Sequence, residues 1–323
     1  MKIAEYLRCV PDISWTYAKQ MGISYAVGRM PDGHMEETAE SFERLKAMKE
    51  VYDINGFELK VIEPAPLNQK IKLGLKGRDE EIERMCSLIT NMGRLGIEVL
   101  CYNFAAHFNW VRTANDIKER GGALVTGYKH SDMDQSEYTE VGLLTKDDLW
   151  SNFEYLQKAI VPVAEKAGVM LAVHPSDPPV DEIQHVARIL TSPEEYERAL
   201  SIVKSDNMGM TMCMGTFTTM GANVPEMIKK FGNKIKFVHI RDVSSMDKYD
   251  FHECFPDNGI NDMAECILQY EKYCPDAYCR IDHVPTLAGE DNSNPGYCYL
   301  GRLLGVGYLK GLLEMSKKVN TNG

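Results

Sequence analysis

Side chains that can bind a metal ion stand at the ends of four apolar segments in the second half of the chain. VMLAVHP and IKFVHIRDV each contain a histidine, MGMTMCMG contains a cysteine and AYCRIDHV contains an aspartate. These residues are His174, Cys213, His239 and Asp282. Imidazole, thiolate and carboxylate are the usual ligands of divalent transition metals. Each residue alone has a structural explanation, as a hydrogen-bonded histidine or a buried, packed cysteine. One such residue on each of four successive segments predicts a metal site.

Short apolar segments alternate with longer segments of helical period along the whole chain. Strands are expected at residues 3–10, 24–30, 57–63, 97–104, 169–175, 208–215, 235–243 and 277–284. Helices are expected between them, among others at residues 36–56, 78–96, 145–168, 192–205 and 299–318. Strands that alternate with helices form a parallel sheet with both faces covered, and eight of them favour a closed barrel. We predict an α/β protein with a single (β/α)8 TIM-barrel domain over residues 1–323. A doubly wound open sheet is the alternative.

Capping signals mark the ends of several predicted helices. The segment 78–96 begins with acidic residues and ends at Gly96, as the helix dipole and a left-handed C-terminal residue would require. Thr145 and Ser192 precede two other helical segments and are predicted N-caps.

The segment from Ala105 to Leu144 shows no convincing periodic pattern. It follows the fourth predicted strand and is polar and contains glycine. A loop of this length in a compact domain usually has a function of its own. We expect a long loop that covers the C-terminal face of the barrel.

The predicted barrel places the four candidate ligands along one arc of its mouth. Active sites of these barrels lie where the strands end, and neighbouring strands are about 4.8 Å apart. A thiolate with two imidazoles suits zinc or iron, whereas the carboxylate also allows manganese. The residues alone leave these three metals open.

The composition argues against several classes of partner. Of 323 residues, 47 are acidic and 36 are basic, for a formal net charge of −11. Nucleic acids and anionic membranes require a basic surface, so neither is an expected partner. A small anionic substrate remains possible, because a few basic residues in a binding site outweigh the negative charge of the rest of the protein at short range.

No segment is predicted to cross a membrane or to direct secretion. Uncharged apolar runs of about 18 residues do not occur. Glu5 and Arg8 interrupt the N-terminal apolar segment, which is unlike a signal peptide. The nine cysteines contain no C-x-x-C pair and are expected to be reduced thiols. We expect a cytoplasmic protein, with a homo-oligomer possible.

Six motifs in this order resemble the mannonate dehydratase family. They are LGL..RDE (73–80), CYNF…W.RT (101–113), HPSDPP (174–179), FVHIRDV (237–243), RIDH (280–283) and PGY…GR..G..Y..GL (295–312). The resemblance extends from about residue 57 to residue 313.

The resemblance implies both a fold and an activity. The family has a barrel similar to that of xylose isomerase and a catalytic divalent cation, usually manganese. It removes water from D-mannonate and forms 2-keto-3-deoxy-D-gluconate. Its metal ligands match His174, Cys213, His239 and Asp282, and its acid and base residues match His283 and Tyr297.

The sequence departs from the family mainly in segments that would face the substrate. AAHFNWVRT replaces a segment with a proline and an aspartate, and Val284 follows the Asp-His pair where glycine is usual. EYLRCVP replaces an aromatic RW.G segment, and Asp242 stands where asparagine is usual. A different aldonate is therefore an alternative substrate.

Three more residues are predicted to bind the sugar acid. Arg112 and Arg241 are candidates to hold its carboxylate through bidentate hydrogen bonds, and Asn103 is a further candidate. His283 and Tyr297 are the candidate acid and base, in either order. A metal-dependent sugar isomerase or epimerase is the alternative enzyme, although such enzymes use paired acidic ligands and only Glu63 ends a strand here. A sugar-acid-binding protein without turnover is a third alternative.

Overall fold

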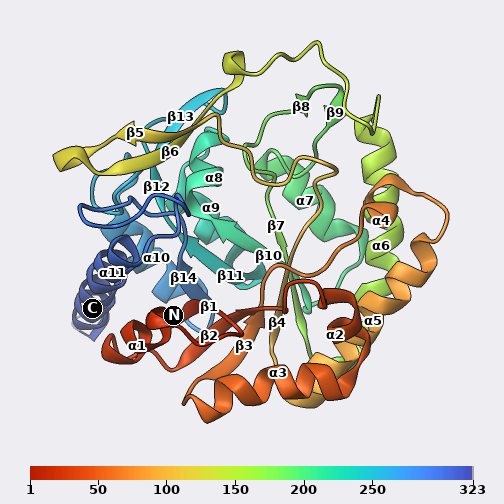
Figure 1. Ribbon diagram of the computed structural model, residues 1–323, viewed down its shortest axis with the longest axis horizontal. Helices are drawn as coiled ribbons and strands as arrows, with labels where there is room; N and C mark the ends of the chain where they lie inside the picture. The colour runs from red at the N-terminus through yellow and green to blue at the C-terminus, as the bar shows by residue number, and fades with distance from the viewer. Residues whose placement is uncertain (322–323) are drawn as a thin grey trace.

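Eight parallel strands form a closed barrel in the computed structural model, which describes residues 1–321 (Figure 1). Around the barrel the order is β1-β14-β11-β10-β7-β4-β3-β2. Their bounds are β1 (Lys2–Arg8), β2 (Tyr25–Arg29), β3 (Glu58–Ile62), β4 (Val99–Asn103), β7 (Met170–His174), β10 (Met208–Cys213), β11 (Ile235–Ile240) and β14 (Tyr278–Ile281). Each of the eight predicted strands is present, and the barrel closes as predicted. The open-sheet alternative is wrong.

The barrel interior follows from the two-residue period of a strand. Alternate side chains point inward and fill the barrel with small, branched and aromatic residues, among them Ala4, Val27, Val61 and Phe237. The other side chains pack against the surrounding helices in a larger apolar core. Both faces of the sheet are buried, which explains the nearly continuous apolar runs of the strands. The last inward position of each strand opens onto the barrel mouth, where polar side chains are tolerated.

Eleven helices are described in residues 1–321, and most of them surround the barrel. They are α1 (Ile13–Gln20), α2 (Met35–Glu40), α3 (Phe42–Ile54), α4 (Gln69–Leu73), α5 (Arg78–Leu95), α6 (Lys146–Ala167), α7 (Pro193–Ile202), α8 (Met214–Thr219), α9 (Val224–Phe231), α10 (Met263–Tyr273) and α11 (Tyr299–Thr321). None of the helices in this described part is long and apolar enough to cross a membrane.

The predicted caps are confirmed, and one helix boundary is corrected. Thr145 forms a capping box with Asp148, and the Ser192 hydroxyl accepts a hydrogen bond from the Glu195 backbone. Gly96 ends α5 in the left-handed region at φ 70°. The single helix predicted over residues 36–56 is two helices instead. Ser41 adopts an extended conformation between them and caps α3.

The segment after β4 contains more structure than the predicted long loop. β5 (Ala114–Lys118) and β6 (Leu124–Lys129) form an antiparallel hairpin around a short 3-10 turn, η1 (Arg120–Gly122). β6 also pairs with β13 (Asp250–Cys254), which pairs with β12 (Asp242–Val243), giving a four-stranded sheet. β8 (Glu182–Ile183) and β9 (Val186–Ala187) form a separate small hairpin. The pattern of β5 is polar on both faces, so only pairing with distant strands reveals this sheet.

Asp242 has a structural role at the start of this sheet. It is buried, and its carboxylate accepts hydrogen bonds from the Val243 backbone at 2.8 Å and from Asn261 Nδ2 at 2.5 Å. Burial raises the pKa of Asp242 to about 6, although these hydrogen bonds oppose the rise. The carboxylate joins β12 to the segment before α10.

We predict that Asp242→Asn changes how stability depends on pH. Because the folded-state pKa lies above the usual value of 3.8, the folded protein holds this proton more tightly than the unfolded chain. The protonated Asp242 therefore contributes to the stability of the fold; this contribution is fully present below about pH 4 and is lost as the pH rises through about 6. The asparagine variant has no such proton. The free energy of unfolding, measured in urea from pH 4.5 to 7, should therefore shift in favour of the variant by about 2 kcal/mol. Parallel curves for the two proteins would contradict this prediction.

Candidate metal centre

Neighbouring strands bring the predicted ligands together at the C-terminal end of the barrel. His174 ends β7 and Cys213 ends β10. Cys213 is the register partner of His239 on β11, and Asn103 is the register partner of His174. Asp282 directly follows β14. Ligand atoms of His174, Cys213 and His239 lie within 4.8 Å of one another.

The two histidines turn ring nitrogens toward each other in a way that suits a bound cation. His174 Nδ1 lies 2.7 Å from the Pro175 carbonyl and must donate to it, so Nε2 carries a lone pair. His239 Nε2 lies 2.9 Å from a Glu63 oxygen, in poor alignment for a hydrogen bond, and the carboxylate still favours a proton there. His239 Nδ1 then also carries a lone pair, 3.1 Å from His174 Nε2. Two facing lone pairs repel each other unless a cation lies between them.

Cys213 and Asp282 complete the donor set. Arg241 Nε and Thr216 Oγ1 each donate a hydrogen bond to the Cys213 sulfur at 3.2 Å and so hold it in place. An Asp282 oxygen lies 3.9 Å from this sulfur and 3.6 Å from His239 Nδ1. The pKa of Asp282 lies well below its usual value despite burial, because His283, two arginines and His239 favour its charge. The residues present therefore fit a divalent cation.

A second donor group shares His239 but is less suited to a metal. It consists of Glu63, Cys101 and His239. Arg280 donates to both Glu63 oxygens, at 2.7 and 3.0 Å, and would have to release them. Cys101 lies in the apolar interior of the barrel, where burial raises its pKa well above the usual value. The group that contains Cys213 is therefore better suited to a divalent cation.

Arg112 and Arg241 lie beneath the site and not in the cavity. Arg112 binds both oxygens of Asp177, at 2.8 and 2.9 Å, and contacts Glu253 at 2.5 Å. Arg241 binds Glu253 at 2.8 Å and Asp177 at 2.7 Å. Neither guanidinium lines the cavity described below. The expected contact of these two arginines with the substrate carboxylate is thus corrected: both hold buried carboxylates in position.

Glu253 orients His283, and the sequence had not singled it out. Its Oε1 lies 3.0 Å from His283 Nδ1, while His283 Nε2 lies 3.2 Å from the Tyr297 hydroxyl. Arg241 and Arg112 lower the pKa of Glu253 to about 2 against the effect of burial, so its carboxylate is charged. Burial and the nearby Asp282 charge raise the pKa of Tyr297, so its phenol keeps its proton. The predicted pair of His283 and Tyr297 is therefore in contact.

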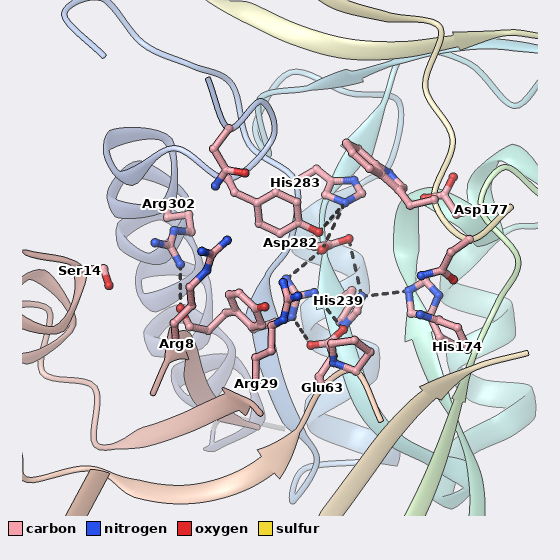
Figure 2. A pocket seen from close by; sticks show the side chains of 18 of the residues that line it. Arg8, Ser14, Arg29, Glu63, His174, Asp177, His239, Asp282, His283 and Arg302 are labelled. Atoms are coloured by element: carbon pink, nitrogen blue, oxygen red, sulfur yellow. Dashed lines mark hydrogen bonds and ion pairs between the residues drawn. The ribbon is translucent and has the colours of Figure 1, made fainter. Parts of the chain in front are cut away.

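A cavity of about 600 Å³ opens above these residues at the barrel mouth. Figure 2 shows His174 on one side of it and Arg8, Arg29 and Arg302 on the other. The predicted residues that line it are Asn103, His174, His239, Asp282, His283 and Tyr297. Cys213 is fully buried beneath the floor.

A closed (β/α)8 barrel with this donor set at its mouth is typical of enzymes that use a divalent metal on a small polar substrate. A family model described as D-mannonate dehydratase (UxuA) matches residues 10–145 and 136–322. The chain belongs to the mannonate dehydratase family.

Individual relatives and solved structures agree with this assignment. The mannonate dehydratase of Endomicrobium trichonymphae is 29% identical, over 98% of this chain and 93% of its own length. That of Streptococcus pneumoniae is 32% identical, over 92% of this chain and 87% of its own. The crystal structure of mannonate dehydratase from Streptococcus suis serotype2 is 31% identical, with a TM-score of 0.93 over 99% of this chain and 95% of that one. A D-tagatose 3-epimerase-like protein, 16% identical with a TM-score of 0.63 over 98% of this chain and 99% of that one, shares the fold.

We predict that Cys213→Ala and Cys101→Ala separate the two donor groups. Metal-free protein, prepared with a chelator, should bind one equivalent of Mn²⁺ or Zn²⁺. Loss of the Cys213 sulfur should weaken this affinity by at least about 100-fold, since ligand loss exceeds the 10–100-fold cost of losing a supporting partner. Cys101→Ala is the matched control and should bind like the wild type. The opposite ranking, measured by calorimetry, would place the metal with Glu63 and Cys101.

Proposed function

We propose that the protein removes water from D-mannonate and forms 2-keto-3-deoxy-D-gluconate, with Mn²⁺ as its divalent cation. The observation that carries this proposal is the hydrogen-bonded series Glu253–His283–Tyr297, since His283 and Tyr297 line the same cavity as three members of the metal-binding group. A dehydration of this type needs a base for the C2 proton and an acid for the C3 hydroxyl. Membership of the mannonate dehydratase family supports the choice of substrate.

A bound divalent cation supplies positive charge that stabilises the negative charge developed when the C2 proton leaves. We assign the base to His283. Its Nδ1 proton is held by the charged Glu253, so Nε2 presents a lone pair toward the cavity. This assignment gives Nε2 the C2 proton and leaves a positive imidazolium whose charge Glu253 and Asp282 offset, at 3.0 and 3.7 Å.

Tyr297 is then the acid. Its raised pKa keeps the phenol protonated at neutral pH, so it can donate to the departing C3 hydroxyl. The C3–O bond breaks, water leaves and the resulting enol becomes the 2-keto group. Tyr297 recovers a proton from His283 Nε2, 3.2 Å away, so the pair returns to its starting state.

The indole of Trp110 covers this acid–base pair on the solvent side. Its ring centroid lies 4.8 Å from that of His283 and 6.3 Å from that of Tyr297. It belongs to the segment AAHFNWVRT, which departs from the usual family sequence. An apolar cover excludes water and strengthens the electrostatic interactions beneath it.

The isomerase or epimerase alternative is not favoured by the geometry. Such an enzyme would be expected to use paired acidic ligands. Glu63, the glutamate that follows a barrel strand, has both oxygens bound to Arg280. The solved epimerases that share the fold are below 25% identical and support the fold alone.

The proposed activity is tested with metal-free protein reloaded with Mn²⁺ and offered a panel of aldonates. Formation of 2-keto-3-deoxy acid from D-mannonate, lost on chelation and restored by metal, is the expected result. Isomerisation of a free sugar, with no keto acid from any aldonate, would overturn the proposal.

We predict that Tyr297→Phe lowers kcat by about 10²- to 10⁴-fold, the usual contribution of a general acid. Metal affinity should stay unchanged, since the phenol is not a ligand. Tyr278→Phe is the control because this tyrosine also points into the barrel but does not line the cavity. Its hydroxyl donates a hydrogen bond of 3.0 Å to Glu98. Steady-state kinetics and metal content measure both effects. Near-normal kcat in the Tyr297 variant would show that another group donates the proton.

A further inference from the structure

An arginine cluster lies across the barrel mouth from the metal-binding group. Arg8 and Arg29 are register partners at the ends of β1 and β2. In the closed order of eight strands, β1 lies opposite β7 and β2 lies opposite β10, the strands that carry His174 and Cys213. Eight strands at about 4.8 Å and a tilt of about 36° give a barrel roughly 15 Å wide. Figure 2 shows this separation, with Arg302 beside Arg8.

The three arginines of this cluster, Arg8, Arg29 and Arg302, retain unused donors. Within residues 1–321, the Arg8 side chain has no ion pair or hydrogen bond, and it lines the cavity. Arg29 binds Asp32 through Nη2 at 2.7 Å, and its Nε is buried with no hydrogen-bond partner in the described chain.

Arg302 is anchored but also incompletely paired. Its Nη1 donates to Glu5 at 2.6 Å and to the Tyr6 carbonyl at 3.0 Å, so the guanidinium is held at the cavity wall. Its Nε is buried and lacks a hydrogen-bond partner among the described residues. A buried donor without a partner is energetically unfavourable, and a ligand that accepts from it relieves this cost.

The remaining acid at this end of the cavity is already satisfied. Asp12 accepts hydrogen bonds from the Ser14 backbone at 2.8 Å and from the Ser14 hydroxyl at 2.5 Å. The Tyr299 hydroxyl donates to its other oxygen at 3.2 Å. Arg29 and Arg302 each have an acidic partner, but no acid among residues 1–321 pairs with Arg8, so the Arg8 guanidinium is free to bind an anion from the cavity.

The proposed dehydration determines which part of a substrate reaches these arginines. C1, C2 and C3 must lie beside the metal-binding group and the His283–Tyr297 pair. The far end of a six-carbon chain then points across the cavity toward Arg8, Arg29 and Arg302. In D-mannonate this end is a neutral hydroxymethyl group, which leaves the guanidiniums without an anion. A carboxylate or phosphate group at C6 would accept from them directly.

We propose that the arginine cluster binds a second anionic group on the substrate, so that aldonic acids with an anion at C6 are preferred to D-mannonate. This proposal rests on the proposed function and narrows its substrate class. The shared chemistry is an anion at C6, supplied by an aldarate or by a 6-phosphoaldonate. EYLRCVP provides Arg8, and this is the segment that departs from the family near the N-terminus.

The test compares D-mannonate, D-mannarate and D-mannonate 6-phosphate with the Mn²⁺-loaded wild type and Arg8→Ala. We expect at least one C6 anion to have the higher kcat/KM in the wild type. Arg8→Ala should lower that value about tenfold, mainly through KM, and change D-mannonate by less than about threefold. Arg44→Ala is the matched control, since this arginine lies on the outer helix α3. The two C6 anions distinguish carboxylate from phosphate recognition.

Binding of the same three acids, measured by calorimetry, keeps this proposal separate from the proposed function. If no acid is dehydrated, the proposed function fails, yet tighter binding of a C6 anion that Arg8→Ala abolishes still supports the arginine cluster. If D-mannonate is dehydrated and is the best substrate, and Arg8→Ala affects all three acids equally, the proposed function stands and this proposal is overturned.

Discussion

The burial of Arg241 is the constraint on which the rest of the site depends. Its guanidinium is fully buried, and a buried charge is stable only when it is paired with good geometry. It binds Glu253 and Asp177, and its Nε lies 3.2 Å from the Cys213 sulfur and 3.1 Å from Asp282. The Arg241 guanidinium therefore holds in place two proposed metal ligands, Cys213 and Asp282, and the Glu253 carboxylate that orients His283. Loss of any partner would leave an uncompensated charge in the interior.

This network also explains the sheet added to the barrel. Glu253 belongs to β13, which pairs with β6 of the hairpin after β4. The same hairpin follows Arg112, which bridges Asp177 and Glu253. The sheet β12-β13-β6-β5 thus delivers to the barrel mouth a carboxylate that none of the eight barrel strands supplies in this position. The segment that looked like a loop is a scaffold for the proposed base.

The sequence allowed prediction of those parts that depend on local pattern. The eight strands follow from apolar runs, and His174, Cys213, His239 and Asp282 could be grouped because parallel strands end at one edge. Glu253 could not be found this way, since its strand is not part of the barrel and joins β6, which lies more than 100 positions earlier. Arg112 and Arg241 were expected in the cavity because a sequence does not reveal which buried carboxylate an arginine meets. Arg8 and Arg29 were missed because their proximity depends on the register of β1 and β2.

The position of the metal tests this account most directly. Crystals of Mn²⁺-loaded protein, measured at the manganese absorption edge, should show one anomalous peak between His174 Nε2, His239 Nδ1, the Cys213 sulfur and Asp282. The ligand distances should be about 2.0–2.4 Å, in the range usual for such donors. A peak among Glu63, Cys101 and His239, or a peak away from both groups, would contradict the central claim that Arg241 holds the metal ligands in place.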